Sequence, residues 1–118
     1  MPDKAPRSDC PIASALSVLG DRWSLLIVRD MMVFGKTTFK EFLDSQESIP
    51  TSTLTARLRK LEEVGLVQRT AYQQNPPRYS YHLTEAGKDL GPVLKALRDW
   101  CDQHIEIQEE LSERLQQS

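Results

Sequence analysis

Residues 51–60 combine hydroxyl, small and basic side chains in a pattern that suits contact with a nucleic acid. The members of this group are Thr51, Ser52, Thr53, Thr55, Ala56, Arg59 and Lys60. On a helical wheel, Ser52, Ala56, Arg59 and Glu63 lie within about 50° of the side opposite Leu54. Short side chains let a helix approach base edges, hydroxyls bond phosphates or bases, and arginine pairs with guanine through two hydrogen bonds. We therefore expect this helix face to enter the major groove of double-stranded DNA. We expect Glu63, late in the helix, to lie past the groove.

Further polar residues flank this segment. A preceding helix that crosses the DNA backbone would offer phosphate contacts, from Lys36, Thr37, Thr38 and Lys40. Arg78 follows two prolines at an expected hairpin tip, and an arginine at a wing tip suits a narrow minor groove. The alternative is that the hydroxyls only cap helices, that the basic face is only solvated, and that Arg78 contacts nothing.

Two cysteines offer redox chemistry. Cys10 immediately precedes Pro11 at an expected helix N-terminus, which stabilises a thiolate, although Asp9 opposes this with its negative charge. Oxidation would proceed through sulfenic acid to a disulfide, with Cys101 as the second candidate. The alternative for Cys101 is a small buried hydrophobe. Cys101 and His104 lack further ligands at zinc spacing, so we expect no metal and no cofactor.

Composition is that of an ordinary globular protein. The chain has 118 residues, of which 27% are charged and 39% hydrophobic, enough for one domain with a modest core. No apolar run approaches the eighteen or so residues of a membrane span, and the polar start "MPDKAPRSDC" has no signal region. We therefore expect a cytoplasmic protein with no membrane partner.

The charge is distributed unevenly. The net charge is −2, yet residues 36–88 hold eight Lys/Arg against six Asp/Glu, and residues 99–118 hold six Asp/Glu against one arginine. An acidic C-terminal segment thus offsets a mildly basic middle, and this asymmetry permits a DNA-facing surface there.

Apolar periodicity predicts the elements that position these residues. Leu54, Leu58 and Leu61 fall on one stripe of a helix that Gly65 ends. Thr38 and Glu41 form a capping-box pattern at the start of another helix. Helices are predicted over residues 10–20, 21–35, 38–45 and 51–64, strands over 66–74 and 78–84, and a long helix from about residue 84 that a proline at position 92 bends.

This order predicts a mainly α fold with a β-hairpin: a winged helix-turn-helix flanked by N- and C-terminal dimerisation helices. We expect a flexible arm over 1–9, the DNA-binding domain with its dimerisation helices over 10–105, and an acidic helix extension or tail over 106–118. The apolar stripe of the last helix is longer than one small domain needs, and would be exposed unless a partner covered it.

Several segments resemble the HxlR-type regulators, which are MarR-like. They are "DCPIASALSVLGDRWSLLIVRDMM", "IPTSTLTARLRKLEEVGLVQR" and "PPRYSYHLTEAGKDLGPVLKALRDW". The resemblance implies a homodimeric winged-helix transcription regulator whose first and last helices build the dimer. The candidate interface residues are Ile12, Leu16, Leu90, Val93, Leu94, Leu97, Trp100, Cys101 and Ile105. Some members of that family sense oxidants or electrophiles through a cysteine at the position of Cys10.

The sequence thus predicts a dimeric DNA-binding transcription regulator that reads a pseudo-palindromic operator and that thiol oxidation at Cys10 controls. One alternative is control by a small-molecule effector; another is a winged-helix protein–protein adaptor without DNA binding. An enzyme is not expected, because no nucleophile–base pair, phosphate loop or metal set is present.

Overall fold

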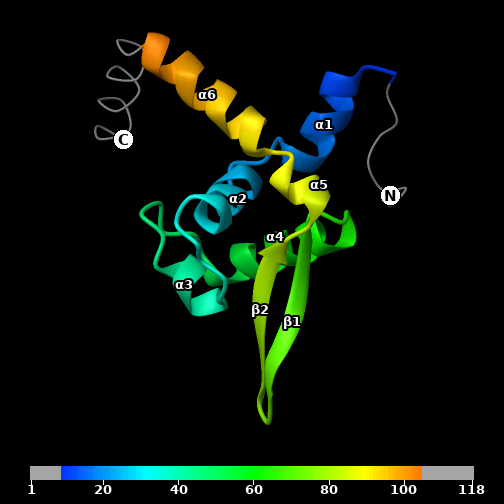
Figure 1. Cartoon of the computed structure of the whole chain (residues 1–118), viewed down its shortest axis with the longest axis vertical. Coiled ribbons are helices and arrows are strands. Elements are labelled where there is room, and N and C mark those ends of the chain that lie inside the picture. The colour runs from blue at the N-terminus through cyan, green and yellow to red at the C-terminus, as the bar shows by residue number, and fades with distance from the viewer. Residues whose placement is uncertain (1–8, 105–118) are drawn as a thin grey trace. The chain divides into compact units, whose positions relative to one another are not determined.

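The computed structural model describes residues 9–104, which contain helices and one two-stranded hairpin (Figure 1). In chain order the elements are α1 (Pro11–Leu19), α2 (Ser24–Met32), α3 (Phe39–Leu43), α4 (Thr51–Glu63), β1 (Val67–Gln74), β2 (Pro77–Leu83), α5 (Glu85–Lys88) and α6 (Gly91–Gln103). The described residues divide into two compact units, residues 9–88 and residues 89–104. The first unit contains a winged helix-turn-helix, in which α3 and α4 precede the hairpin of β1 and β2, as the sequence predicts.

The start of α2 is set by a side chain that precedes it. The Asp21 carboxylate accepts hydrogen bonds from the backbone N–H groups of Trp23 and Ser24, each at 3.0 Å, and from the Ser24 hydroxyl at 2.5 Å. These bonds satisfy N–H groups that have no partner within the helix. Asp21 therefore orders the turn that leads into α2, but the prediction that it is the N-cap is wrong: the helix begins at Ser24 and its N-cap is Trp23.

The capping box at the start of α3 is confirmed. The Glu41 N–H donates to the Thr38 hydroxyl at 3.3 Å, and the Thr38 N–H donates to the Glu41 carboxylate at 3.0 Å. A helix of five residues is too short to be stable alone, so α3 depends on this cap and on the core beneath it.

The core of the first unit lies where α2, α3, α4 and the base of the hairpin meet. The three leucines of α4 that the sequence places on one stripe, Leu54, Leu58 and Leu61, are all buried, as predicted. They pack with five other buried apolar residues: Ile27, Met31, Phe42, Ile49 and Val67. Burying this stripe leaves the opposite face of α4 to solvent.

The wing has an anchor that the sequence does not reveal. β1 and β2 pair antiparallel, with Val67 opposite Leu83. In addition, the Tyr81 N–H donates to the Thr37 carbonyl at 2.7 Å, and Thr38 forms an isolated bridge with Ser80. The segment just before α3 therefore joins the edge of the hairpin and fixes the wing to the helix-turn-helix.

The prediction of one long, bent helix from Thr84 is wrong. Thr84 does cap a helix, since its hydroxyl accepts from the Gly87 N–H at 3.2 Å, but that helix, α5, ends at Lys88. Gly91 and Pro92 stand at the first positions of a separate helix, α6. Proline has no N–H to donate, so it fits the first turn, where no intrahelical acceptor is available. Pro92 thus starts a helix rather than bending one.

Exposed apolar side chains mark α1 and, in the second unit, α6. Ile12 and Leu16 on α1 are 71% and 60% exposed, and Leu97 and Trp100 on α6 are 51% and 56% exposed. Within residues 9–104, no single helix is long and apolar enough to cross a membrane. Helices α1 and α2 together have the required length and apolarity, but the pair is bent by 79°.

Candidate nucleic-acid interface

The exposed face of α4 carries the side chains that the sequence singles out. Five of the predicted contacts are exposed there: Thr51, Ser52, Thr55, Ala56 and Arg59. The N-cap of α4 is Pro50, whose side chain makes no capping hydrogen bond. The hydroxyls of the first turn therefore do not cap the helix, which argues against the capping-only alternative. The first-turn N–H groups of α4 also lack a side-chain acceptor at the N-cap, as an anion-binding helix end requires.

Arg59 borders a groove between α4 and the wing. The groove has a volume of about 350 Å³, and its lining includes Thr55 and Arg59 of α4 and Arg69 and Tyr81 of the hairpin. Glu62 also lines it, but its carboxylate lies 3.3 Å from the Arg69 guanidinium. Within residues 9–104 Arg59 has no ion-pair partner, so its charge is available to a ligand.

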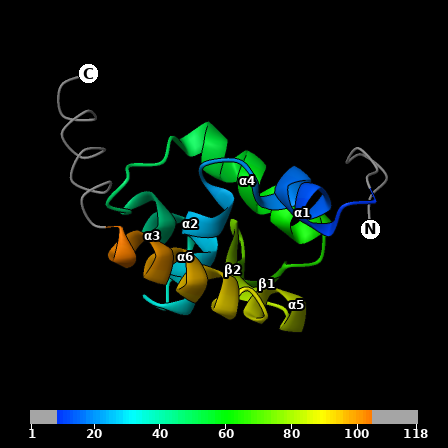
Figure 2. The same ribbon diagram turned by 90° about the horizontal axis from the view of Figure 1, so that it is seen from above.

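Lys60, which the sequence places on the DNA-facing surface, contacts another part of the protein instead. Its ammonium donates to the Ser17 carbonyl at 3.2 Å, and this bond joins α4 to α1, which lies beside it (Figure 2). Lys60 and Thr53 are both half-buried. The carbonyl near the C-terminal end of α1 attracts a cation, so Lys60 supports the position of α4 instead of extending its exposed basic face.

The segment before α3 uses most of its polar groups internally. The Glu41 carboxylate accepts from the N–H groups of Thr37 and Thr38, both at 3.0 Å, and from both hydroxyls, at 3.4 and 3.1 Å. These backbone N–H groups lower the pKa of Glu41. The Lys36 ammonium lies 3.8 Å from the Asp30 carboxylate. The capping box therefore engages both threonines, and Lys36 is held by an acidic neighbour.

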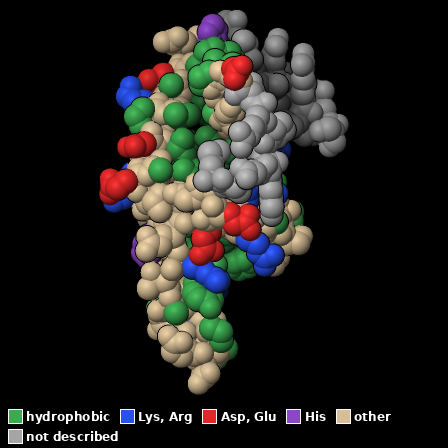
Figure 3. All heavy atoms as spheres, turned by 90° about the vertical axis from the view of Figure 1, so that its right-hand side faces the viewer, with side chains coloured by type: hydrophobic (Ala, Val, Ile, Leu, Met, Phe, Trp, Pro, Cys, Tyr) green, Lys and Arg blue, Asp and Glu red, His purple; other side chains and the backbone are tan. Residues whose placement is uncertain are grey.

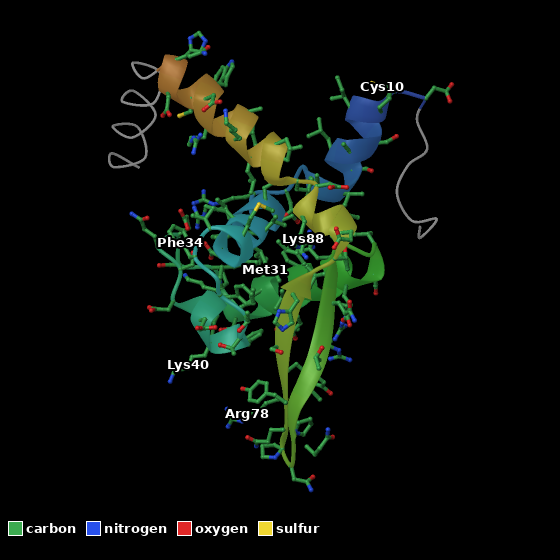
Figure 4. The ribbon with its side chains drawn as sticks, in the orientation of Figure 1. Cys10, Met31, Phe34, Lys40, Arg78 and Lys88 are labelled. Atoms are coloured by element: carbon green, nitrogen blue, oxygen red, sulfur yellow. The ribbon has the colours of Figure 1, made fainter. Side chains whose placement is uncertain are left out.

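Lys40 and Arg78 remain as exposed cations on this side of the molecule. Figure 4 shows Lys40 on α3 and Arg78 near the wing tip, both on the same side of the hairpin. Both line a second groove, of about 470 Å³, between α3 and the wing. Neither has an ion-pair partner in the described part of the chain.

The opposite side of the wing differs. On the face seen in Figure 3, acidic and basic side chains lie next to one another at the base of the wing, and uncharged side chains form its tip. The Glu62–Arg69 pair belongs to the junction of α4 and β1. Neutralised charges do little to attract phosphate.

Sequence reasoning missed the tyrosines of the wing. Tyr72 is 56% exposed, and Tyr79 stacks with Arg69, whose guanidinium carbon lies 4.3 Å from the ring centroid. Aromatic faces and arginine both contact bases and sugars in nucleic-acid complexes. The one available signal was the alternation of Tyr79 and Tyr81 along the predicted strand.

The predicted redox residues and the predicted dimer residues are each divided between α1 with its N-cap, in the first unit, and residues of the second unit. Cys10 is exposed at the N-cap of α1, and Cys101 is half-buried on α6. Of the other interface candidates on α6, Val93 is exposed and Leu94 is half-buried. Ile105 lies outside the described residues.

Residues 18–109 match the family described as HxlR-like helix-turn-helix. An HTH-type transcriptional regulator of Mycobacterium bovis is 43% identical over 94 residues, which are 80% of this chain and 58% of the relative, so the chain spans little more than half of that protein. A second such regulator, from Synechocystis, is 38% identical over 98 residues, covering 80% of this chain and 72% of the relative.

Solved structures with the same fold include one redox regulator and a further transcriptional regulator. The reduced form of the redox regulator HypR has a TM-score of 0.75 and 35% identity, covering 86% of this chain and 99% of that one. The reduced form of the transcriptional regulator YodB from Bacillus subtilis has a TM-score of 0.67 and 36% identity, covering 81% and 94% of the two chains.

Proposed function

Because the chain belongs to the HxlR-like helix-turn-helix family, whose matched relatives are HTH-type transcriptional regulators, we propose that it is a DNA-binding transcription regulator. It acts as a homodimer on a pseudo-palindromic operator, with α4 in the major groove and the wing around Arg78 at the adjacent minor groove. The observation that carries this proposal is the face of α4 opposite its buried leucines: it is exposed, it bears short hydroxylic side chains, and its arginine, Arg59, has no ion-pair partner in the described residues.

Charge supports the same orientation. Lys40, Arg59 and Arg78 come from α3, α4 and the wing, and all three are exposed. In the proposed complex Arg59 reads a base, whereas Lys40 and Arg78 neutralise phosphates or enter the minor groove. The protein–protein adaptor is the less favoured alternative, because it gives no reason for three available cations around one helix-turn-helix.

The exposed apolar side chains of α1 and α6 support the proposed dimerisation through these helices. Leu16 on α1 and Leu97 and Trp100 on α6 are each more than half exposed. Apolar side chains of this size gather at protein–protein interfaces. A second copy of the chain that covers these residues would present two α4 helices to two operator half-sites.

Replacing Arg59 with alanine is expected to weaken operator binding by about 1–3 kcal/mol, with the loss concentrated at one base position, because a bidentate arginine–guanine contact is removed. The measurement is a fluorescence anisotropy titration at fixed salt, with the operator selected by the purified protein from a random pool and with single-base variants of it. Heparin competition separates specific from non-specific binding.

Lys88→Ala is the matched control for charge. Lys88 also loses one positive charge on substitution, but it lies on α5 and its ammonium is 3.5 Å from Glu85. This variant is expected to bind every operator variant with nearly unchanged relative affinities. Equal losses for the two variants on all DNA sequences would show that α4 does not read bases.

A redox input is the second part of the proposal. Cys10 is exposed, and two of the similar solved structures are of one protein, the redox regulator HypR, in its reduced and oxidised forms. We propose that a mild oxidant converts the Cys10 thiol to a disulfide with Cys101 of the other subunit and thereby lowers DNA affinity. Two thiols lose two electrons and two protons to the oxidant, for which diamide serves as the probe.

Cys10→Ser is expected to abolish both the diamide-dependent dimer band on a non-reducing gel and the diamide-dependent release of DNA. Cys101→Ser should abolish the band as well, because the proposed disulfide needs both thiols. If Cys10→Ser leaves the band and the DNA release as in the wild-type protein, Cys10 is not the sensor, and control by a small-molecule effector becomes the favoured alternative.

A further inference from the structure

The groove between α3 and the wing has aromatic walls. Its volume is about 470 Å³, which lies in the range of sites for small organic ligands. Four aromatic side chains contribute to its lining: Phe39, Tyr72, Tyr79 and Tyr81. All of them belong to the first unit of the chain, so the groove is complete without α6.

Strand geometry explains why the rings converge. Tyr79 and Tyr81 are two residues apart on β2, so their side chains leave the same face of the hairpin. Tyr72 is the extra residue where the register shifts between Ala71 and Gln73. A bulge of this kind re-aims a side chain that regular pairing would send to the other face. Arg69 stacks on Tyr79 and holds that ring in place.

Two available cations lie at the same groove. Lys40 and Arg78 both line it, and Figure 4 shows them on one side of the wing. Neither has an ion-pair partner among residues 9–104. The neighbouring Arg69, by contrast, lies 3.3 Å from Glu62. The positive charge at this groove is therefore not neutralised, and an anion placed there would be attracted.

We propose that this groove binds a planar aromatic carboxylate, with its ring against the tyrosines and its carboxylate at Arg78 and Lys40. Stacked or edge-to-face contacts favour an aromatic ring over a saturated one of the same size. Arginine favours a carboxylate because its planar fork donates two parallel hydrogen bonds to the two carboxylate oxygens. Burial raises the pKa of Tyr81, so its hydroxyl stays protonated and can donate to the ligand.

The consequence for regulation rests on the proposed function. Lys40 and Arg78 are also the proposed phosphate and minor-groove contacts. A carboxylate bound between them offsets one of their two positive charges and occupies the space that the DNA backbone would take. The ligand and the operator therefore compete, and the ligand releases the regulator from DNA independently of its cysteines.

The test measures ligand binding to the full-length protein without DNA. Isothermal titration with 2-naphthoate is expected to show saturable binding of one molecule per chain. Decahydronaphthalene-2-carboxylate, which has the same two fused rings without aromaticity, and 2-naphthamide, which lacks the charge, should each bind at least about fivefold more weakly. The substitutions Arg78→Gln and Tyr72→Ala should weaken the binding of 2-naphthoate to a similar extent. Both residues are exposed, so neither substitution disturbs the core.

Arg98→Gln is the control, since Arg98 is an exposed arginine of α6 whose side chain is 66% exposed, and it should leave 2-naphthoate binding unchanged. The site is disproved if 2-naphthoate shows no saturable binding, or if Arg78→Gln and Tyr72→Ala bind it as the wild-type protein and Arg98→Gln do. Operator titration then separates the two proposals. Ligand binding without any operator binding would overturn the proposed function alone, and operator binding without ligand binding would overturn this inference alone.

Discussion

Replacing Phe42 with alanine is expected to lower the free energy of unfolding by about 3–5 kcal/mol, as for other large buried aromatic side chains. Phe42 is 1% exposed and meets the Tyr81 ring edge-on, with the centroids 6.2 Å apart and the planes at 66°. It is therefore the side chain that joins α3 to the wing. Because α3 has only five residues, losing this contact removes its main support.

Urea unfolding followed by circular dichroism measures this loss. Phe34→Ala is the matched control: the same ring is removed, but Phe34 is 62% exposed. Its effect should stay below about 1 kcal/mol, the range of an exposed contact between a cation and a ring. Similar losses for the two variants would contradict the placement of Phe42 at the centre of the core.

Replacing Arg29 with alanine is expected to lower the free energy of unfolding by about 2–3 kcal/mol, because the buried Asp30 carboxylate loses its hydrogen-bonded partner and keeps only the Lys36 ammonium, 3.8 Å away. The Arg29 guanidinium donates to Glu47 at 2.9 and 2.8 Å and to Asp30 at 3.1 and 2.7 Å. Asp30 is 3% exposed. This network fixes the loop between α3 and α4 to α2. It therefore helps to set the orientation of α4 on the core.

The pH dependence of stability tests the network independently. Hydrogen bonds from Arg29 lower the pKa of Glu47 from 4.5 to about 2. A carboxyl whose pKa is lower in the folded protein stabilises it fully above the unfolded value, and this stabilisation is lost as the pH falls. The stability difference between the wild-type protein and Glu47→Gln should therefore be largest above pH 4.5 and shrink as the pH falls towards about 2. A pH-independent difference would contradict the pairing.

Much of the fold was predictable because its signals are local. Leucines at helical spacing, Gly65 after α4 and the Thr38–Glu41 box each act within a few residues, and the structure contains all of them. The break between α5 and α6 was missed because a proline after one turn of helix fits either a bend or a new start.

The site was predictable only in part, because the fate of a long cationic side chain depends on distant partners. The sequence shows Lys60 on the exposed half of α4, but it does not show that the Ser17 carbonyl lies 3.2 Å from its ammonium. Lys36 likewise lies near Asp30. Arg59 and Arg78 look no different from Lys60 in the sequence, and only the fold shows that they have no such neighbour in its described part.

The wing illustrates the same limit for a strand. Alternation predicts the hairpin, but the position of Tyr72 follows from a bulge, which depends on how the two strands pair. The aromatic groove beside α3 therefore could not be predicted from the sequence, because it depends on the register of the two strands.

The placement of α4 in the major groove is tested most directly by cleaving the DNA from within the complex. An iron chelate that generates hydroxyl radicals is attached at Ala56→Cys, with Cys10 and Cys101 replaced by serine, and the control carries the chelate at Ala86→Cys on α5. Both positions are exposed. We expect the chelate at residue 56 to cleave the selected operator in two clusters, one in each half-site, separated by about 10–10.5 base pairs or a multiple of that spacing. Cleavage from residue 56 that is no stronger than from residue 86, or that is spread evenly along the DNA, would contradict the proposed mode of binding.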